Sequence, residues 1–148
     1  MALVYLGLGS NLGDREANLA AAEARVASIH GVTVVKTSSI AETDPVDYLD
    51  QPRFLNRVIA IETTRKPLDL LGELKRAEEE LGRVKNVPKG PRCIDLDILL
   101  YDALIMTTET LTVPHPEIRN RPFILKHLVE LDPDLADPVT GAGYRDLL

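Results

Sequence analysis

Asp95 and Asp97 are the residues of this chain best placed to do chemistry. They lie in an apolar run that predicts a buried strand ending near Leu100. Side chains of a strand alternate between its two faces, so both carboxylates point the same way. Two charges on one buried face are costly unless a cation meets them. The pattern therefore predicts a cation site on this strand.

A basic segment, residues 83–92, comes directly before the two aspartates. It holds four basic residues and no acidic one: Arg83, Lys85, Lys89 and Arg92. Mg²⁺ binds one or two carboxylates and keeps its other positions for water and phosphate oxygens. Arg and Lys bind phosphate through charge-assisted hydrogen bonds. The combination indicates a site for a metal-bound polyphosphate. The alternative is that Asp-x-Asp lies on a solvent-facing edge of the sheet.

Hydrophobic periodicity predicts the elements that must position these residues. Strands are expected at 3–8, 32–40, 54–63, up to Leu100, and at 104–106. Three helices are expected: one capped by Asp14, one from Pro67 to Gly82, and one capped by Asn120 with Pro122 at its first position. The chain has more expected strands than a series of βαβ units would contain. This excess favours an α+β fold with a mainly antiparallel sheet. Without a repeat or linker, residues 1–148 are expected to form a single domain.

Glu78 interrupts the apolar stripe expected on the second helix. That stripe consists of Leu68, Leu71, Leu74 and Leu81, and Glu78 falls four residues after Leu74. Two interpretations stay open at this point. The side chain either extends to water from the edge of the stripe, or it points into a polar site beside the basic segment.

Two polar segments with prolines, 41–53 and 114–121, are expected to be loops. Loops of this length in a small domain are usually functional. His115 shares the second loop with Arg119 and Arg121, which favours a contact to phosphate or ribose over a purely structural surface histidine. Phe54 and Phe123 border these loops, which suits a flat ligand that stacks on aromatic rings.

Other residues that resemble reactive or binding groups are expected to be structural. His30 and His127 are expected to be solvated, and Cys93 to be inert packing. The glycines from Gly7 to Gly13 follow a strand, but position 12 is Leu, so the dinucleotide fingerprint fails and a tight turn serving the fold is expected. A P-loop motif is absent from the sequence.

The bulk properties restrict the class of partner. The formal net charge is −6, and outside the basic segment the charge is −10, which argues against a broad nucleic-acid interface. A single cysteine excludes an internal disulfide and fits the cytoplasm. Neither a signal peptide nor a membrane-spanning stretch is expected. No obligate protein partner is evident from the sequence.

The motifs together resemble the 6-hydroxymethyl-7,8-dihydropterin pyrophosphokinase family of folate biosynthesis. The resemblance covers nearly the whole chain, and these blocks carry it: Leu-Gly-Ser-Asn-Leu-Gly near the start, Glu-Thr-Asp-Pro-Val, Gln-Pro-Arg-Phe-Leu-Asn, Gly-Arg-Val, Gly-Pro-Arg-Cys-Ile-Asp-Leu-Asp, Leu-Thr-Val-Pro-His-Pro and Asn-Arg-Pro-Phe. It implies a ferredoxin-like α+β fold. It also implies transfer of pyrophosphate from MgATP to the hydroxymethyl oxygen of the pterin, with AMP as the other product.

The resemblance also implies roles for individual residues. Asp95 and Asp97 would hold two Mg²⁺ ions, with Arg83 and Arg92 as catalytic basic groups on the phosphates. The implied ATP contacts, besides those two arginines, are Glu78, Lys85, Thr112, His115 and Arg121. The implied pterin contacts are Thr43, Pro45, Val46, Phe54, Asn56 and Phe123. The chain departs from the family pattern at Asp44, Phe54, Lys75, Lys85 and Thr110.

Two other functions fit the sequence less well. A nucleotidyltransferase carries Gly-Ser close before its carboxylates, whereas Gly9-Ser10 precedes Asp95 here by more than eighty residues. A ferredoxin-like module that only binds a small ligand has no need of paired strand carboxylates beside a basic segment. The expected partners are therefore the small-molecule substrates ATP and the pterin, without nucleic acid or membrane.

Overall fold

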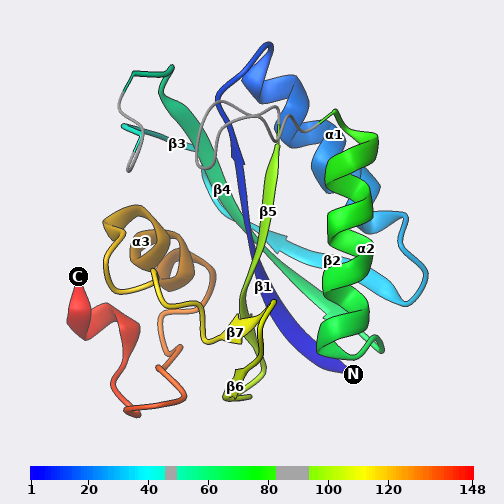
Figure 1. The fold of residues 1–148 in the computed structure, drawn as a ribbon. Coiled ribbons are helices and arrows are strands. Elements are labelled where there is room, and N and C mark those ends of the chain that lie inside the picture. The colour runs from blue at the N-terminus through cyan, green and yellow to red at the C-terminus, as the bar shows by residue number, and fades with distance from the viewer. Residues whose placement is uncertain (46–49, 83–93) are drawn as a thin grey trace.

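A five-stranded sheet lies between two layers of helices in the computed structural model, which describes residues 1–45, 50–82 and 94–148 (Figure 1). The strands are β1 (Ala2–Ser10), β2 (Val32–Thr37), β3 (Ala41–Thr43), β4 (Phe54–Thr63) and β5 (Asp95–Tyr101). Helices α1 (Arg15–Ala27) and α2 (Pro67–Glu80) cover one face, and α3 (Pro122–Leu131) with the 3-10 helix η1 (Tyr144–Leu147) covers part of the other.

Every pairing in the sheet is antiparallel, with strand order β2-β4-β1-β5 and β3 paired to the far end of β4. Apart from the short β3, the chain order β1-α1-β2-β4-α2-β5 with this strand order is the ferredoxin-like arrangement. The expected α+β class is therefore confirmed. The expected loop over 41–53 is corrected at its start, because Ala41, Glu42 and Thr43 pair with β4 as a strand.

Alternation along the strands divides the hydrophobic core into two layers. In β1, Val4, Leu6 and Leu8 face α1 and α2, whereas Tyr5 faces α3. The inward side of α2 differs from the expected stripe: Leu70 and Ala77 are buried, and Leu68 is 50% exposed. The buried face is turned relative to the expected stripe: Leu74 and Glu78 belong to both, and Leu70 and Ala77 complete the buried face in place of Leu68.

The helix starts follow the expected chemistry only in part. The Asp14 side chain accepts the Ala17 backbone N–H at 3.1 Å, so its capping role is confirmed. Pro67 and Pro122 each stand at the first position of their helix. The expected cap at Asn120 is wrong, because Arg121 is the N-cap of α3 and makes no side-chain capping bond.

A small ribbon stands apart from the main sheet. It consists of β6 (Met106–Thr107) and β7 (Thr112–Val113), paired antiparallel. The sequence predicts a strand at 104–106, whereas the observed strand β6 begins only at Met106. The ribbon contacts β5 through β7 and leads into the segment with His115.

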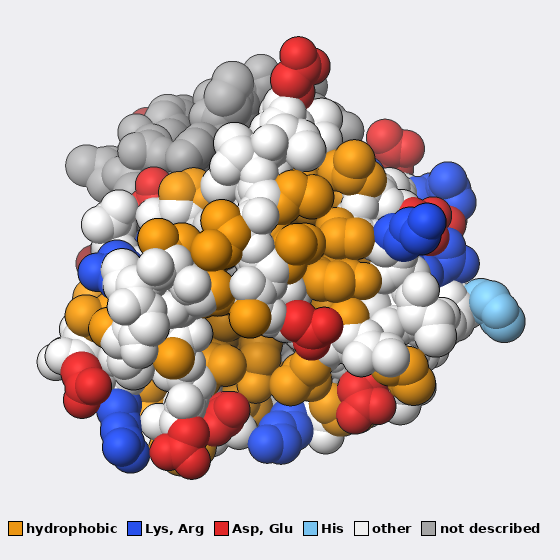
Figure 2. All heavy atoms as spheres, turned by 90° about the horizontal axis from the view of Figure 1, so that it is seen from below, with side chains coloured by type: hydrophobic (Ala, Val, Ile, Leu, Met, Phe, Trp, Pro, Cys, Tyr) orange, Lys and Arg blue, Asp and Glu red, His pale blue; other side chains and the backbone are white. Residues whose placement is uncertain are grey.

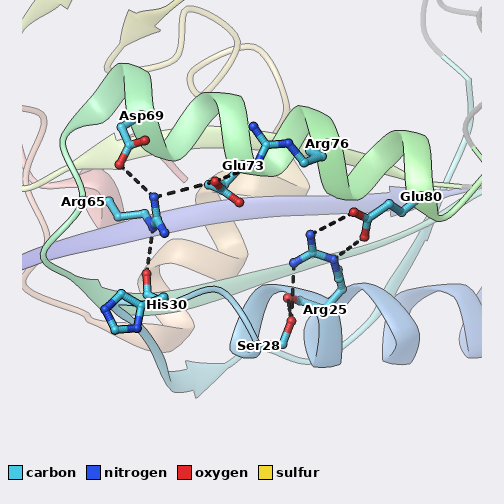
Figure 3. Close-up of polar contacts among 8 residues, drawn as sticks. All are labelled: Arg25, Ser28, His30, Arg65, Asp69, Glu73, Arg76 and Glu80. Carbon is cyan, nitrogen blue, oxygen red and sulfur yellow. Dashed lines mark hydrogen bonds and ion pairs between the residues drawn. The ribbon is translucent and has the colours of Figure 1, made fainter.

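Polar contacts tie α1, α2 and the turn before α2 together on the layer opposite α3 (Figure 3). Arg25 of α1 donates from Nε to Glu80 Oε2 of α2 at 2.6 Å. Arg65 donates from Nε to the His30 carbonyl oxygen at 2.7 Å and pairs with Asp69 at 2.9 Å. His30 itself is exposed, as expected. These contacts fix the helical layer that supports the sheet.

Hydrophobic side chains gather in the middle of the face seen from below, with most charged side chains around its margin (Figure 2). Leu3, Val35 and Ile105 are among the large hydrophobic residues of the chain that remain exposed. None of the helices in the described ranges is long and apolar enough to cross a membrane.

Candidate active site

The register of β1 with its two neighbours brings the candidate residues side by side. Gly9 is paired with Asn56 of β4 on one side and with Asp95 of β5 on the other. Gly7 is paired in the same way with Val58 and Asp97. Paired residues of neighbouring strands point to the same face. Both aspartates therefore share one face of the sheet, as the sequence predicts, and this is the α3 side.

A hollow on this face, which we call the sheet cleft, collects most of the residues that the sequence singles out. It lies between the sheet and the start of α3. The following residues line it: Gly7, Leu8, Gly9, Thr43, Asp44, Phe54, Asn56, Arg57, Val58, Asp95, Asp97, Leu99, His115, Arg121, Phe123 and Ile124. Of the residues implied to contact pterin, Pro45 is buried outside this lining.

A second hollow, the ribbon cleft, lies between β5, α2 and the β6–β7 ribbon. Its lining consists of Leu71, Lys75, Leu96, Asp97, Ile98, Thr108, Glu109, Thr110, Leu111, Thr112, His115 and Pro116. Thr112 and His115 were expected to contact ATP, and both lie here. Asp97 and His115 line both hollows. The two clefts therefore adjoin at this carboxylate and this imidazole.

Acidic charge dominates the point where the clefts meet. Burial, helped by the carboxylates of Asp95 and Glu78, raises the pKa of Asp97 to about 7, whereas Arg121 and Lys75 act in the opposite direction. A site that disfavours carboxylate charge in this way favours a bound cation. No group of three metal-ligating side chains occurs among the described residues. Two carboxylates suffice for Mg²⁺ that also binds substrate phosphates, so the residues present fit that ion.

Glu78 is buried and forms a hydrogen bond to the backbone of β5, the strand that carries Asp95 and Asp97. Its Oε2 accepts the backbone N–H of Leu96 at 2.8 Å, and its Oε1 lies 4.0 Å from Lys75 Nζ. The interpretation that Glu78 extends to water is wrong, because the residue is 1% exposed. Glu78 lines neither cleft.

Asn56 enters the sheet cleft with its amide oriented by a neighbour. Its Nδ2 donates to the Thr43 hydroxyl at 2.5 Å, across the β3–β4 pairing. An oriented amide presents an acceptor and a donor in fixed directions. This arrangement suits a ligand edge that carries both kinds of group.

His115 is held both by β5 and by its own loop. Its backbone N–H donates to the Leu99 carbonyl oxygen at 2.9 Å, and its Nδ1 accepts the Glu117 N–H at 3.1 Å. Since Nδ1 is an acceptor, the neutral ring carries its proton on Nε2. His115 is therefore a hydrogen-bond donor at the junction of the two clefts.

Phe123 and Arg121 reach the sheet cleft from the start of α3. Arg121 Nε lies 3.7 Å from Glu117. The Phe123 ring meets His127 edge-on, with 6.5 Å between ring centroids and 72° between ring planes. The expectation that His127 is solvated is wrong, because it is 2% exposed and burial lowers its pKa.

Sequence reasoning missed Gly7 and Gly9. Gly9 lies inside β1 and not in a turn, which corrects the expectation for it, whereas Gly7 falls within the strand expected at 3–8. A signal was available: their spacing of two matches that of Asp95 and Asp97, and it places both glycines on one face of a strand. Arg83, Lys85, Arg92, Val46 and Cys93 lie outside the described residues.

Residues 5–133 match the family model of 7,8-dihydro-6-hydroxymethylpterin-pyrophosphokinase. The chain belongs to this family. A Bacillus subtilis relative named 2-amino-4-hydroxy-6-hydroxymethyldihydropteridine pyrophosphokinase is 46% identical over 140 residues, which cover 95% of this chain and 84% of that protein. A Haemophilus influenzae relative of the same name is 42% identical and is matched over 86% of its length.

Some members of the family are much longer. The Schizosaccharomyces pombe folic acid synthesis protein fol1 is 44% identical over 99% of this chain, yet the match covers 20% of its own length. A Plasmodium falciparum HPPK-DHPS structure shares the fold, with a TM-score of 0.78 and 16% identity over 99% of this chain and 42% of that one. The chain thus spans about a fifth of the fungal protein and most of the bacterial pyrophosphokinases.

Proposed function

We propose that this chain transfers pyrophosphate from ATP to the hydroxymethyl group of 6-hydroxymethyl-7,8-dihydropterin. The products are AMP and the pterin diphosphate, which serves folate biosynthesis. Family membership and the names of the bacterial relatives support this assignment. The observation that carries it here is that two hollows adjoin at Asp97 and His115. Transfer between two substrates requires such adjoining sites.

The sheet cleft suits the pterin. A flat ring can stack on Phe123 and Phe54 while the oriented Asn56 amide binds its edge. The ring then lies on the same face as Asp95 and Asp97, so its hydroxymethyl arm can extend towards these carboxylates. We assign to the pterin as well Thr43, at the end of β3, and Pro45 and Val46, which follow it in the sequence.

The ribbon cleft suits ATP. Thr112 provides a hydroxyl, and His115 donates from Nε2 at the end of the hollow that adjoins the sheet cleft. Arg121, which lines the sheet cleft together with His115, adds a guanidinium. We assign Arg83, Lys85 and Arg92 to the phosphates as well, on the family resemblance. Glu78 acts on this site by holding β5 in place.

Asp95 and Asp97 would hold two Mg²⁺ ions, which when bound neutralise charge on the phosphates. The chain's own residues bind and orient the two substrates. The pterin hydroxyl is held in line with the β-phosphorus, and basic side chains stabilise the charge of the leaving AMP. Positioning supplies much of the rate in phosphoryl transfer.

We further propose that residues 1–148 act as one domain, with these small molecules as sole obligate partners. A single cysteine supports action in the reducing cytoplasm.

Analysis of the nucleotide product tests the function. The chain is incubated with ATP, Mg²⁺ and 6-hydroxymethyl-7,8-dihydropterin, and the nucleotides are separated by chromatography. We expect AMP in a 1:1 ratio to the pterin diphosphate. Release of inorganic pyrophosphate would indicate a nucleotidyltransferase, and binding without turnover would indicate a ligand-binding module. Either of these two results would overturn the proposal.

A further inference from the structure

Gly9 has unusually little space for a side chain. A Cβ atom built on Gly9 would lie 3.1 Å from Asn56 Oδ1 and 3.6 Å from Phe54 Cδ1. A Cβ atom on Gly7, two residues earlier on the same face, would meet only Leu99 at 3.6 Å, an ordinary van der Waals distance. The two glycines of the cleft floor therefore differ: alanine fits at position 7 and crowds an amide at position 9.

Backbone conformation does not explain the glycine at position 9. Positive φ occurs at Gly13, Gly31, Gly82 and Gly141, but Gly9 lies within β1 and is not among the positive-φ residues. Glycine inside a strand is destabilising relative to alanine, and it often marks close approach of another group. The close group here is the Asn56 amide.

The Asn56 amide cannot easily turn away from position 9. Its Nδ2 donates to the Thr43 hydroxyl at 2.5 Å, and this bond places Oδ1 on the Gly9 side. A side chain at position 9 would push Oδ1 and lengthen the bond to Thr43. Thr43 and the space above Gly9 thus hold the amide from opposite sides.

We propose that Gly9 is a positioning residue, whose missing side chain lets Asn56 hold the amide orientation that binds the pterin edge. The inference rests on the proposed function and adds to it a second determinant of specificity. A site whose polar groups are fixed in advance rejects ligands that leave them unpaired. Gly9 therefore acts on pterin affinity through Asn56 and has no effect on ATP.

Matched alanine variants on the same strand test the proposal. Gly9→Ala and Gly7→Ala are compared with wild type for the Kd of pterin and of a non-hydrolysable ATP analogue, by calorimetry, and for kcat. We expect Gly9→Ala to weaken pterin binding about tenfold, since it disturbs the part-buried hydrogen bond that orients the Asn56 amide. Its ATP affinity should stay within twofold of wild type. Gly7→Ala should stay within about threefold for both ligands, since it adds only an ordinary contact.

A double-mutant cycle shows whether Gly9 acts through Asn56. If it does, Gly9→Ala has little further effect on pterin Kd when Asn56 is already alanine. Additive losses would overturn the proposal, as would equal behaviour of Gly9→Ala and Gly7→Ala. If Gly9→Ala fails to fold, the Gly9→Ala/Asn56→Ala double variant should fold, and its failure would likewise overturn the proposal. Failure of the proposed function is distinct, because wild type itself would then form no AMP from ATP and the pterin.

Discussion

Glu78 of α2 accepts the backbone N–H of Leu96, with 2.8 Å between Oε2 and N. Leu96 stands between Asp95 and Asp97, and β5 is an edge strand of the main sheet. A buried helix carboxylate therefore fixes the short stretch of edge strand that carries both candidate metal ligands. Without Glu78 this backbone N–H would be buried without its carboxylate acceptor.

We predict that Glu78→Ala lowers the free energy of unfolding by about 2–4 kcal/mol, because it removes a buried charged acceptor and leaves a cavity. Glu78→Gln is the matched control, since its amide oxygen can still accept the Leu96 N–H, and it should cost less than half as much. Urea denaturation without ligands measures both changes. Equal losses in the two variants would show that the negative charge, and not the hydrogen bond, holds the strand.

Asp95→Asn and Asp97→Asn should each lower turnover by at least about 100-fold while the fold survives, because each removes a carboxylate that would hold Mg²⁺ at the phosphates. Turnover at saturating Mg²⁺ is measured beside circular dichroism. Asp134→Asn serves as the control, because its carboxylate is 87% exposed and pairs only loosely with Arg145 at 3.8 Å. Near-normal turnover in either folded cleft variant would refute the metal assignment.

The two roles of His115 can be separated by replacing it with Asn. An Asn side chain can accept the N–H two residues ahead, at Glu117, and so keep the loop bond that Nδ1 now makes. It does not reproduce the donor at Nε2. We expect His115→Asn to keep its thermal stability and to weaken ATP binding by about 10–100-fold, the cost of losing a hydrogen bond to a charged group. His30→Asn, at an exposed position, is the control. Unchanged ATP affinity would make His115 a structural residue of the loop.

Sequence patterns predicted those parts of the molecule that depend on local order. The strand 54–63 and the α1 cap at Asp14 follow directly from periodicity and side-chain chemistry. β3 was missed because Glu42 and Thr43 precede an Asp-Pro pair and resemble a loop, and only their pairing with β4 makes them a strand.

The sequence predicted which residues belong to the candidate site better than it predicted how they are arranged in space. The aspartate pair carries its own signal, since a spacing of two fixes a shared face. The floor at Gly9 depends on register, because Gly9 pairs with Asn56 and Asp95, which lie 47 and 86 positions later in the chain. Burial of Glu78 and His127 depends on which elements pack over them, which a helix pattern alone does not specify.

His127 leads to a prediction about the pH dependence of stability. Burial lowers its pKa below the ordinary value of 6.5, Glu130 acts in the opposite direction, and Arg57 and Lys126 lower it further. His127 therefore takes up a proton at a higher pH in the unfolded chain than in the folded chain. The stabilisation that neutral His127 contributes is fully present above about pH 6.5 and is lost as the pH falls. Glu130 has a lowered pKa and stays ionised over this range.

We expect wild type to lose stability relative to a His127→Leu variant when the pH falls from 7.5 to 5.5, because leucine cannot take up a proton. The comparison must be made as a difference, since Asp97, with a pKa of about 7, titrates in the same range with the opposite sign. Urea unfolding of both proteins at several pH values gives the two curves, and the Asp97 contribution cancels between them. Parallel curves would mean that His127 has the same proton affinity in the folded and unfolded chains, contrary to its burial beside Phe123.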